Sequence, residues 1–174
     1  MTERFGDWMQ SYSGGVFYPL DPRPEDIKLR DIAHALSNLC RFGGHCVSFY
    51  SVAEHSVHVS RVVPKEDALW GLLHDATEAY LVDVPRPIKK YLGGYVEAEA
   101  RLEAAIKAKF GLVGDMPASV KQADNDVLIA EAEQIMHKPL KLWSTPGKPA
   151  NVSIKCWAPE RACQDFINRY LELI

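Results

Sequence analysis

The chain has 174 residues, of which 47% are hydrophobic and 25% charged, a balance typical of a globular domain with a packed core. Its formal net charge of −3 argues against a nucleic-acid polymer as partner, because phosphate backbones are bound by strongly basic surfaces. No apolar run reaches the roughly 18 residues that a membrane span requires, so we expect no membrane partner.

Four cysteines are present, at Cys40, Cys46, Cys156 and Cys163. None forms a CxxC pair, which argues against a structural zinc site of the ribbon or finger type. The N-terminus has no apolar run behind a basic start and does not predict a secretory signal. We therefore expect free, buried thiols and a cytoplasmic protein.

The first thirty residues predict a β-hairpin followed by a connector. Residues 7–12 and 16–18 have strand character, and Gly14 and Gly15 between them predict the turn. The next segment contains three prolines and is expected to be extended, because proline is excluded from helix interiors. These prolines are Pro19, Pro22 and Pro24.

From Asp31 onward the apolar residues recur at helical spacing, which predicts an all-α helical bundle. Asp31 is expected to cap the first helix, and Ser51 with Glu54 forms a capping box at the second. Ser119 and Gln122 suggest a further capping box. The predicted helices span Asp31 to Leu39, Ser51 to about Val63, Glu66 to about Leu81, Tyr95 to Phe110, Ala118 to about Met136 and Ala158 to Ile174.

We interpret residues 1–174 as a single domain with three parts. Residues 1–30 form the hairpin and connector, residues 31–136 the core, and residues 137–174 a loop and the final helix. Residues 138–152 are rich in proline and predict the loop, in which Trp143 is expected to pack rather than to cover a pocket.

Two histidines and two aspartates occur in an order that suits metal binding. His55 lies in one predicted helix, the doublet His74–Asp75 lies among leucines and alanines in the next, and Asp124 lies beside an apolar stripe. Buried charge is costly unless it is paired or bound to a metal. Imidazole suits Mn, Fe, Co, Ni and Zn, whereas carboxylates suit Mn and Mg, so we expect one divalent ion with open positions.

Glu78 follows His74 by one helical turn, where it can handle a water held by such an ion. Metal-activated water hydrolyses phosphate esters at neutral pH. A plainer interpretation is a polar cluster that only rigidifies the bundle. His58 is expected at the surface, and Asp126 is expected to face solvent.

In the order H…HD…D the chain resembles the HD-domain phosphohydrolases, and most of all the bacterial HD-domain 5′-deoxynucleotidases and their phage-type relatives. The resemblance covers roughly Asp31 to Met136. The segments that carry it are Arg41–His45, Tyr50–Ser56, His74–Glu78, Asp83–Lys89 and Val120–Asp124.

This resemblance implies an HD-domain helical bundle, a site for one metal ion such as Mn or Co, and hydrolysis of deoxyribonucleoside 5′-monophosphates. It implies His55, His74, Asp75 and Asp124 as metal ligands and Glu78 as the catalytic residue that orients or deprotonates the attacking water.

The resemblance also assigns substrate contacts. Arg41 is implied on the substrate phosphate, and its fork of donors suits phosphate oxygens independently of the resemblance. Asp83 is implied near the sugar. Phe42 stands where the nucleotidases have a tryptophan against the nucleoside, a departure that leaves base and sugar preference open. The sequence also leaves the oligomeric state open, a homo-oligomer included.

Other activities of the HD class fit less well. Binuclear phosphodiesterases need further histidines after the doublet, and residues 76–123 contain none. Alarmone hydrolases carry a second acidic residue after the position of Glu78, where this chain has Ala79. Hydrolysis of nucleoside di- or triphosphates, and a non-catalytic nucleotide-binding module, remain as alternatives, although a module would not require Glu78.

Overall fold

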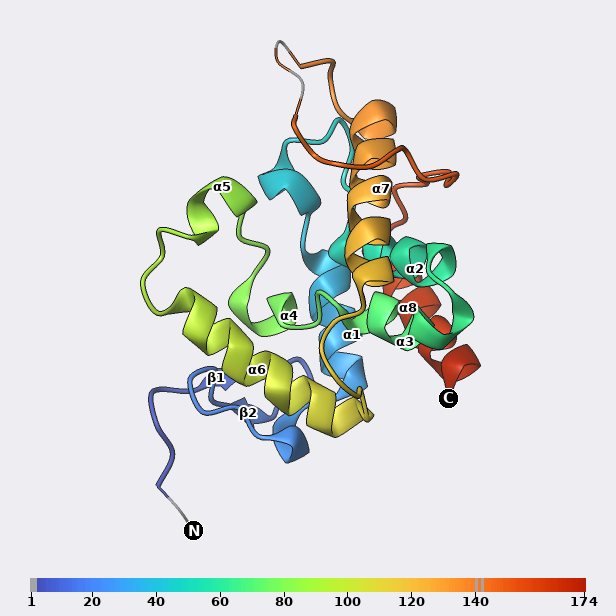
Figure 1. Cartoon of the computed structure of the whole chain (residues 1–174). Coiled ribbons are helices and arrows are strands. Elements are labelled where there is room, and N and C mark those ends of the chain that lie inside the picture. The colour runs from blue at the N-terminus through green and yellow to red at the C-terminus, as the bar shows by residue number, and fades with distance from the viewer. Residues whose placement is uncertain (1–2, 140, 142) are drawn as a thin grey trace.

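The computed structural model describes residues 3–139, 141 and 143–174, and most of these residues are helical (Figure 1). None of the helices in that part of the chain is long and apolar enough to cross a membrane. The α-helices are α1 (Leu29–Asn38), α2 (Val52–Val62), α3 (Ala68–Leu73), α4 (Glu78–Leu81), α5 (Arg86–Lys89), α6 (Tyr95–Phe110), α7 (Ala118–Ile135) and α8 (Pro159–Leu173). Short 3-10 helices span Pro24–Asp26, Arg41–Gly44 and Lys65–Asp67.

The predicted N-terminal hairpin is confirmed. Strands β1 (Met9–Gln10) and β2 (Val16–Phe17) pair antiparallel, with Met9 opposite Phe17. The turn between them is closed by backbone hydrogen bonds between Ser11 and Gly15 and between Gly14 and Ser11. The proline-rich connector is not wholly extended, because it contains the 3-10 helix that begins at Pro24; a proline is tolerated at a first helical position.

Helix α1 begins two residues earlier than the sequence predicts, so the expectation that Asp31 caps it is wrong. Asp31 is buried inside the helix, and its carboxylate accepts hydrogen bonds from the backbone N–H of Ser13 at 2.8 Å and from the Ser13 hydroxyl at 3.0 Å. The side chain therefore fastens the hairpin to α1 instead of capping the helix.

At the start of α2, half of the predicted capping box forms. The Ser51 hydroxyl accepts a hydrogen bond from the backbone N–H of Glu54 at 3.1 Å. The fully buried Glu54 carboxylate accepts instead from the backbone N–H groups of Lys155 at 2.8 Å and Trp157 at 2.6 Å. A residue near the start of α2 thus holds the segment that leads into α8.

The predicted helix from Glu66 to Leu81 is interrupted. It ends as α3 at Leu73 and resumes as α4 at Glu78. In the turn between them, backbone hydrogen bonds join residues three apart, such as Ala76 N–H to the Leu73 carbonyl. Neighbouring residues of a regular α-helix point about 100° apart. The tighter turn lets the side chains of His74 and Asp75 approach the same place.

The remaining predicted helices are confirmed within about one residue, because their ends carry strong local signals. Gly111 closes α6 with a φ of 70°, as the sequence predicts. The capping box at Ser119 is wrong: Pro117 precedes α7, and the Ser119 hydroxyl donates to Asp67. The described residues of the 138–152 loop contain no helix or strand, and residues 140 and 142 lie outside the described part.

Helix α2 is the centre of the bundle and contacts α1, α3, α7 and α8. In Figure 1, α2, α3 and α8 gather on one side of α1, and α6 lies on the other. A large apolar cluster fills the space around α1, α2 and α8, and a smaller one joins α2 and α3 to α7. Because α2 contacts both α3 and α7, the polar residues that these three elements carry are brought together.

Candidate metal centre

Three side chains from separate elements converge on one point. His55 comes from α2, His74 from the turn after α3, and Asp124 from α7, and one ligand atom of each lies within 4.8 Å of the other two. Nε2 of His55 is 3.3 Å from Nε2 of His74 and 3.3 Å from Oδ1 of Asp124. Two imidazole nitrogens and a carboxylate oxygen at this spacing form a group that can hold a divalent metal ion.

Asp75 lies at the edge of this group. Its Oδ2 is 3.2 Å from Nε2 of His74 and 3.6 Å from Nε2 of His55. The structure therefore brings together all four residues that the sequence suggests as ligands, with His55, His74 and Asp124 in the tightest arrangement.

The other ring nitrogen of each histidine is held by a hydrogen bond. Nδ1 of His55 donates to Oε1 of Glu131 at 2.6 Å, and Nδ1 of His74 donates to the Gly71 carbonyl at 2.8 Å. A carbonyl oxygen only accepts, so His74 carries a proton on Nδ1, and its Nε2 is the nitrogen that faces His55 and Asp75. Partners of this kind orient metal-binding histidines in known metal sites.

Glu131 is the main residue that the sequence analysis missed. It is fully buried, and besides His55 it accepts from the Tyr50 hydroxyl at 2.7 Å and from Nε of Arg41 at 3.2 Å. Burial raises the pKa of Glu131, but the charges of Arg41 and His55 outweigh burial and lower it below its usual range. A usable signal was its position seven residues after Asp124, two turns along the same face of α7.

The charges within the cluster depend on one another. Burial and the charge of Arg41 lower the pKa of His55, but Glu131 and Asp124 outweigh them and raise it to about 9. Burial raises the pKa of Asp124, whereas its hydrogen bond with His55 and the charge of that ring lower it to about 2. In the metal-free protein a protonated imidazole thus supplies the positive charge that the carboxylates require, and a divalent ion can take over that role.

Glu78 lies beside the cluster in a poorly solvated position. Its Oε2 is buried and has no hydrogen-bond partner among the described residues. Burial, followed by repulsion from Asp75 and Asp83, raises the pKa of Glu78 well above its usual range. A carboxyl group with such a pKa and a free oxygen is suited to exchanging a proton with a bound water.

Arg41 is buried and fixed in place. Its Nε and one terminal nitrogen, Nη2, lie 3.2 Å from Oε2 of Glu131, and the other terminal nitrogen, Nη1, is 3.6 Å from Oδ2 of Asp75. Its guanidinium therefore reaches the cluster from one side, and it is not a surface arginine at a helix end.

Phe42 and Asp83 are both half-buried. Phe42 has a φ of 57°, and its ring lies 6.1 Å from that of Trp143. Burial raises the pKa of Asp83, and the charges of Arg41 and Asp75 both act on it, which places its carboxyl within electrostatic reach of the cluster.

The expectations for His58 and Trp143 are wrong. His58 is buried. Its Nε2 lies 3.5 Å from Oε1 of Glu54, and the centre of its ring lies 5.7 Å from that of Trp157. Asp126 accepts from the backbone N–H of Lys148 at 3.0 Å, so it fastens the 138–152 loop to α7. Trp143 is 49% exposed and is not packed in a core.

The four cysteines are free, as expected, although they are half-buried rather than buried.

Arg86 is a second residue that the sequence analysis missed. One terminal nitrogen, Nη2, lies 2.5 Å from Oδ2 of Asp124, and the other, Nη1, lies 3.0 Å from the side-chain oxygen of Asn125. Its side chain is nevertheless 61% exposed, so a largely solvated cation borders the Asp124 carboxylate.

No protein-family model matches the chain. It is 39% identical over 169 residues to the uncharacterized protein YfdR of Escherichia coli K12, and the alignment covers 95% of both chains. It is also 42% identical over 142 residues to an uncharacterized protein of Rhodobacter capsulatus, covering 74% of this chain and 72% of the relative. The chain therefore belongs to the same protein family as YfdR.

Proposed function

We propose that the chain is a metal-dependent phosphohydrolase of the HD-domain type that releases phosphate from ribo- or deoxyribonucleoside 5′-monophosphates. The observation that carries this proposal is the convergence of His55, His74 and Asp124, with Asp75 at their edge. The H…HD…D order, the helical elements that carry it and the orienting bonds on both Nδ1 atoms support the same conclusion.

The donor set fits one divalent ion, held by His55, His74, Asp124 and Asp75. Imidazole with carboxylate suits Mn and Co, and also Fe, Ni, Zn or Mg. Such an ion supplies positive charge that lowers the pKa of a bound water and of nearby carboxyls and that stabilises phosphoryl oxygens.

The chain's own residues supply the remaining functions. Glu78, through its unpartnered Oε2, accepts the proton of the attacking water once the carboxyl is ionised. Arg41 is held by Glu131 so that the nitrogen nearest Asp75 faces the phosphoryl oxygens, whose negative charge it offsets. Phe42 and Asp83 border the nucleoside. Glu78 also favours an enzyme over a nucleotide-binding module, because binding alone needs no buried carboxyl with a free oxygen.

Phosphate release tests this proposal directly. The purified chain, stripped of metal, is assayed with nucleoside 5′-mono-, di- and triphosphates in the presence of Mn, Co, Fe, Ni, Zn or Mg. We expect release from monophosphates with at least one of these ions and none in chelator. Absence of release with every nucleotide and every ion would contradict the proposal.

Glu78→Gln separates catalysis from binding. We expect this variant to bind metal as the wild type does and to lose about 100-fold or more in kcat, the usual contribution of a general base. Glu97→Gln, at an exposed position on α6, is the matched control and should retain both properties. Equal activity of Glu78→Gln and the wild type would leave only a binding function.

A further inference from the structure

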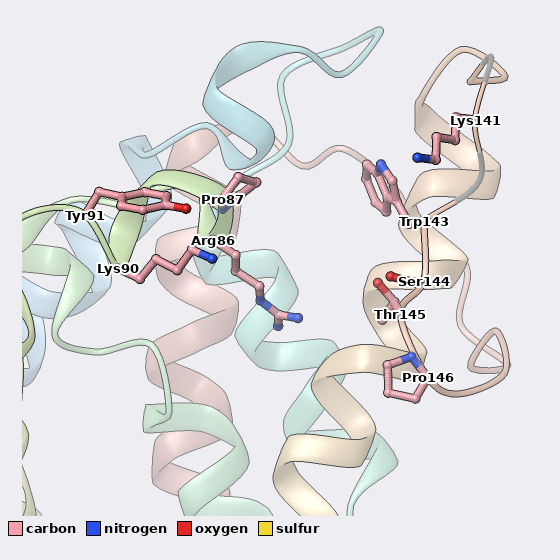
Figure 2. A pocket seen from close by; sticks show the side chains of 9 residues that line it. All are labelled: Arg86, Pro87, Lys90, Tyr91, Lys141, Trp143, Ser144, Thr145 and Pro146. Atoms are coloured by element: carbon pink, nitrogen blue, oxygen red, sulfur yellow. The ribbon is translucent and has the colours of Figure 1, made fainter.

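A groove opens next to the candidate metal centre. Its volume is about 850 Å³. One wall is formed by α5 and the residues that follow it, and the other by residue 141 and residues 143–146 of the proline-rich loop. Figure 2 shows these two walls facing each other across the opening. Ligand pockets commonly have volumes of about 300–1,000 Å³, so this space is sufficient for a nucleotide-sized group.

The groove is connected to the candidate metal centre at two places. Arg86 lies in its wall and also contacts Asp124 at 2.5 Å. Trp143, on the opposite wall, has its ring 6.1 Å from that of Phe42, which follows the buried Arg41. The groove therefore borders the cluster on the side of Asp124 and Phe42.

The charge of the groove is opposite to that of the whole chain. Arg86, Lys90 and Lys141 line it, and none of the described residues in its lining carries a carboxylate, whereas the formal net charge of the chain is −3. The hydroxyls of Ser144 and Thr145 also line it. A neutral nucleoside does not need three cations, so this lining fits a ligand with negative charge beyond the phosphate at the metal centre.

Two exposed aromatic rings stand on opposite walls. Tyr91 is 76% exposed and Trp143 is 49% exposed, and Figure 2 shows the side chains of Arg86 and Lys90 in the space between them. Aromatic faces that alternate with cations are the usual means of binding single-stranded nucleic acid, in which bases alternate with phosphates.

The wall that carries Trp143 is anchored to the helix that carries Asp124. The Asp126 carboxylate accepts from the backbone N–H of Lys148, and its backbone carbonyl accepts from Ala150 at 2.9 Å. A Cβ at Gly147 would lie 2.3 Å from Oδ1 of Asp126, so the chain passes α7 as closely as glycine permits. These contacts fasten the segment that directly follows this wall to α7.

We propose that this groove binds the second nucleotide of a 5′-phosphorylated dinucleotide or of the 5′ end of a short single strand. The terminal phosphate then lies at the metal centre, the next phosphate lies among Lys90, Lys141 and Arg86, and the two bases contact Trp143 and Tyr91. The inference rests on the proposed phosphohydrolase function and names a larger substrate for the same site.

The test compares a deoxynucleoside 5′-monophosphate with a 5′-phosphorylated dinucleotide, as substrates of the wild type and as ligands of metal-loaded Glu78→Gln followed by tryptophan fluorescence. We expect the dinucleotide to bind at least tenfold more tightly than the mononucleotide and to have the lower KM. An unphosphorylated dinucleotide should bind without being hydrolysed. Equal binding of mono- and dinucleotide by metal-loaded Glu78→Gln, in which the groove is unaltered, would overturn the proposal.

The double variant Lys90→Ala/Lys141→Ala should raise the Kd and KM of the dinucleotide at least tenfold, and those of the mononucleotide much less. Its log Kd should depend less steeply on log salt, by at most about 0.7, because the two lysines neutralise a single phosphate and each lost phosphate contact on a single strand removes about 0.7. Lys109→Ala/Lys121→Ala changes the net charge equally at exposed positions outside the groove and is the matched control. Equal losses in the two double variants would contradict a specific site.

Tyr91→Leu separates base contact from phosphate contact. Loss of a stacked base should weaken dinucleotide binding at least fivefold. If a nucleoside diphosphate binds as tightly as the dinucleotide and Tyr91→Leu has no effect, the groove binds a second phosphate only, and the assignment of the second base is overturned.

The outcome is also distinguishable from failure of the proposed function. Lysine-dependent dinucleotide binding without phosphate release would refute the hydrolase and support the groove. Release from monophosphates without any effect of the groove variants would support the hydrolase and refute the groove.

Discussion

His55 and Glu131 form a fully buried pair in which Nδ1 of the imidazole donates to Oε1 of the carboxylate at 2.6 Å. They lie on different helices, α2 and α7, and the opposite ring nitrogen of His55 faces His74 and Asp124. The pair therefore sets the direction in which His55 presents its Nε2 to these two residues.

Glu131→Gln removes the charge that orients His55 and compensates Arg41. We expect metal affinity to fall about 10- to 100-fold, as for other residues that hydrogen-bond to a metal ligand. Stability should fall by up to about 3–5 kcal/mol, because Arg41 keeps its buried charge without its main partner. Calorimetric metal titration and urea unfolding measure the two effects.

Excess metal should restore activity to Glu131→Gln if the residue positions His55, whereas simple structural damage would not respond. Glu133→Gln, at an exposed position on the same helix, should change neither quantity appreciably. Unchanged metal affinity in Glu131→Gln would contradict the positioning role.

The metal-free protein should lose stability as the pH rises from 6.5 towards 9. The folded-state pKa of His55, about 9, is raised above its ordinary 6.5, so the folded chain binds more protons in this interval. Its stabilising contribution is complete below pH 6.5 and is lost as the pH passes about 9, and it amounts to about 3 kcal/mol at most. Urea unfolding in chelator measures it, and a constant or rising stability would refute the prediction.

Asp124→Asn should weaken metal binding by more than about 100-fold. This exceeds the loss in metal affinity that is typical when a residue that only hydrogen-bonds to a metal ligand is replaced. The amide keeps the size of the side chain but loses the charge that His55 and the metal require. Asp126→Asn is the matched control, because Asp126 lies two residues along the same helix and contacts the loop instead. Similar metal affinities in the two variants would remove Asp124 from the ligand set.

Gly71→Ala should destabilise the chain by about 1–2 kcal/mol, since the cost of overpacking exceeds the gain in helix propensity. The added Cβ would lie 3.0 Å from Cα of Ser60 and 3.1 Å from Cγ2 of Val63, and so would press α3 away from α2. Because these elements position His74 and His55, metal affinity should fall as well. Gly93→Ala, with nothing within 4 Å, should have little effect on unfolding or on metal affinity.

Local sequence signals were sufficient for most of the helices. Helix α6 was predicted from Tyr95 to Phe110 as it is observed, because a run of strong helix formers ends at a glycine. The signals failed where a long-range contact decided the outcome. Asp31 and Ser119 are both typical helix-capping residues, yet one binds Ser13 of the hairpin and the other binds Asp67.

The sequence by itself determined the kinds of donor atoms in the candidate site and their order along the chain. His55, the doublet His74–Asp75 and Asp124 were identifiable because buried polar groups among apolar helical residues require partners. The tertiary structure decided which partners they have. In the sequence, Glu131 resembles any other helix-forming residue, and it contacts His55 only because α7 packs against α2. The groove beside Arg86 forms only because α5 faces a loop some fifty residues away along the chain. Spacing along one helix is a local property, whereas a hydrogen bond or a cavity between elements depends on how their faces pack.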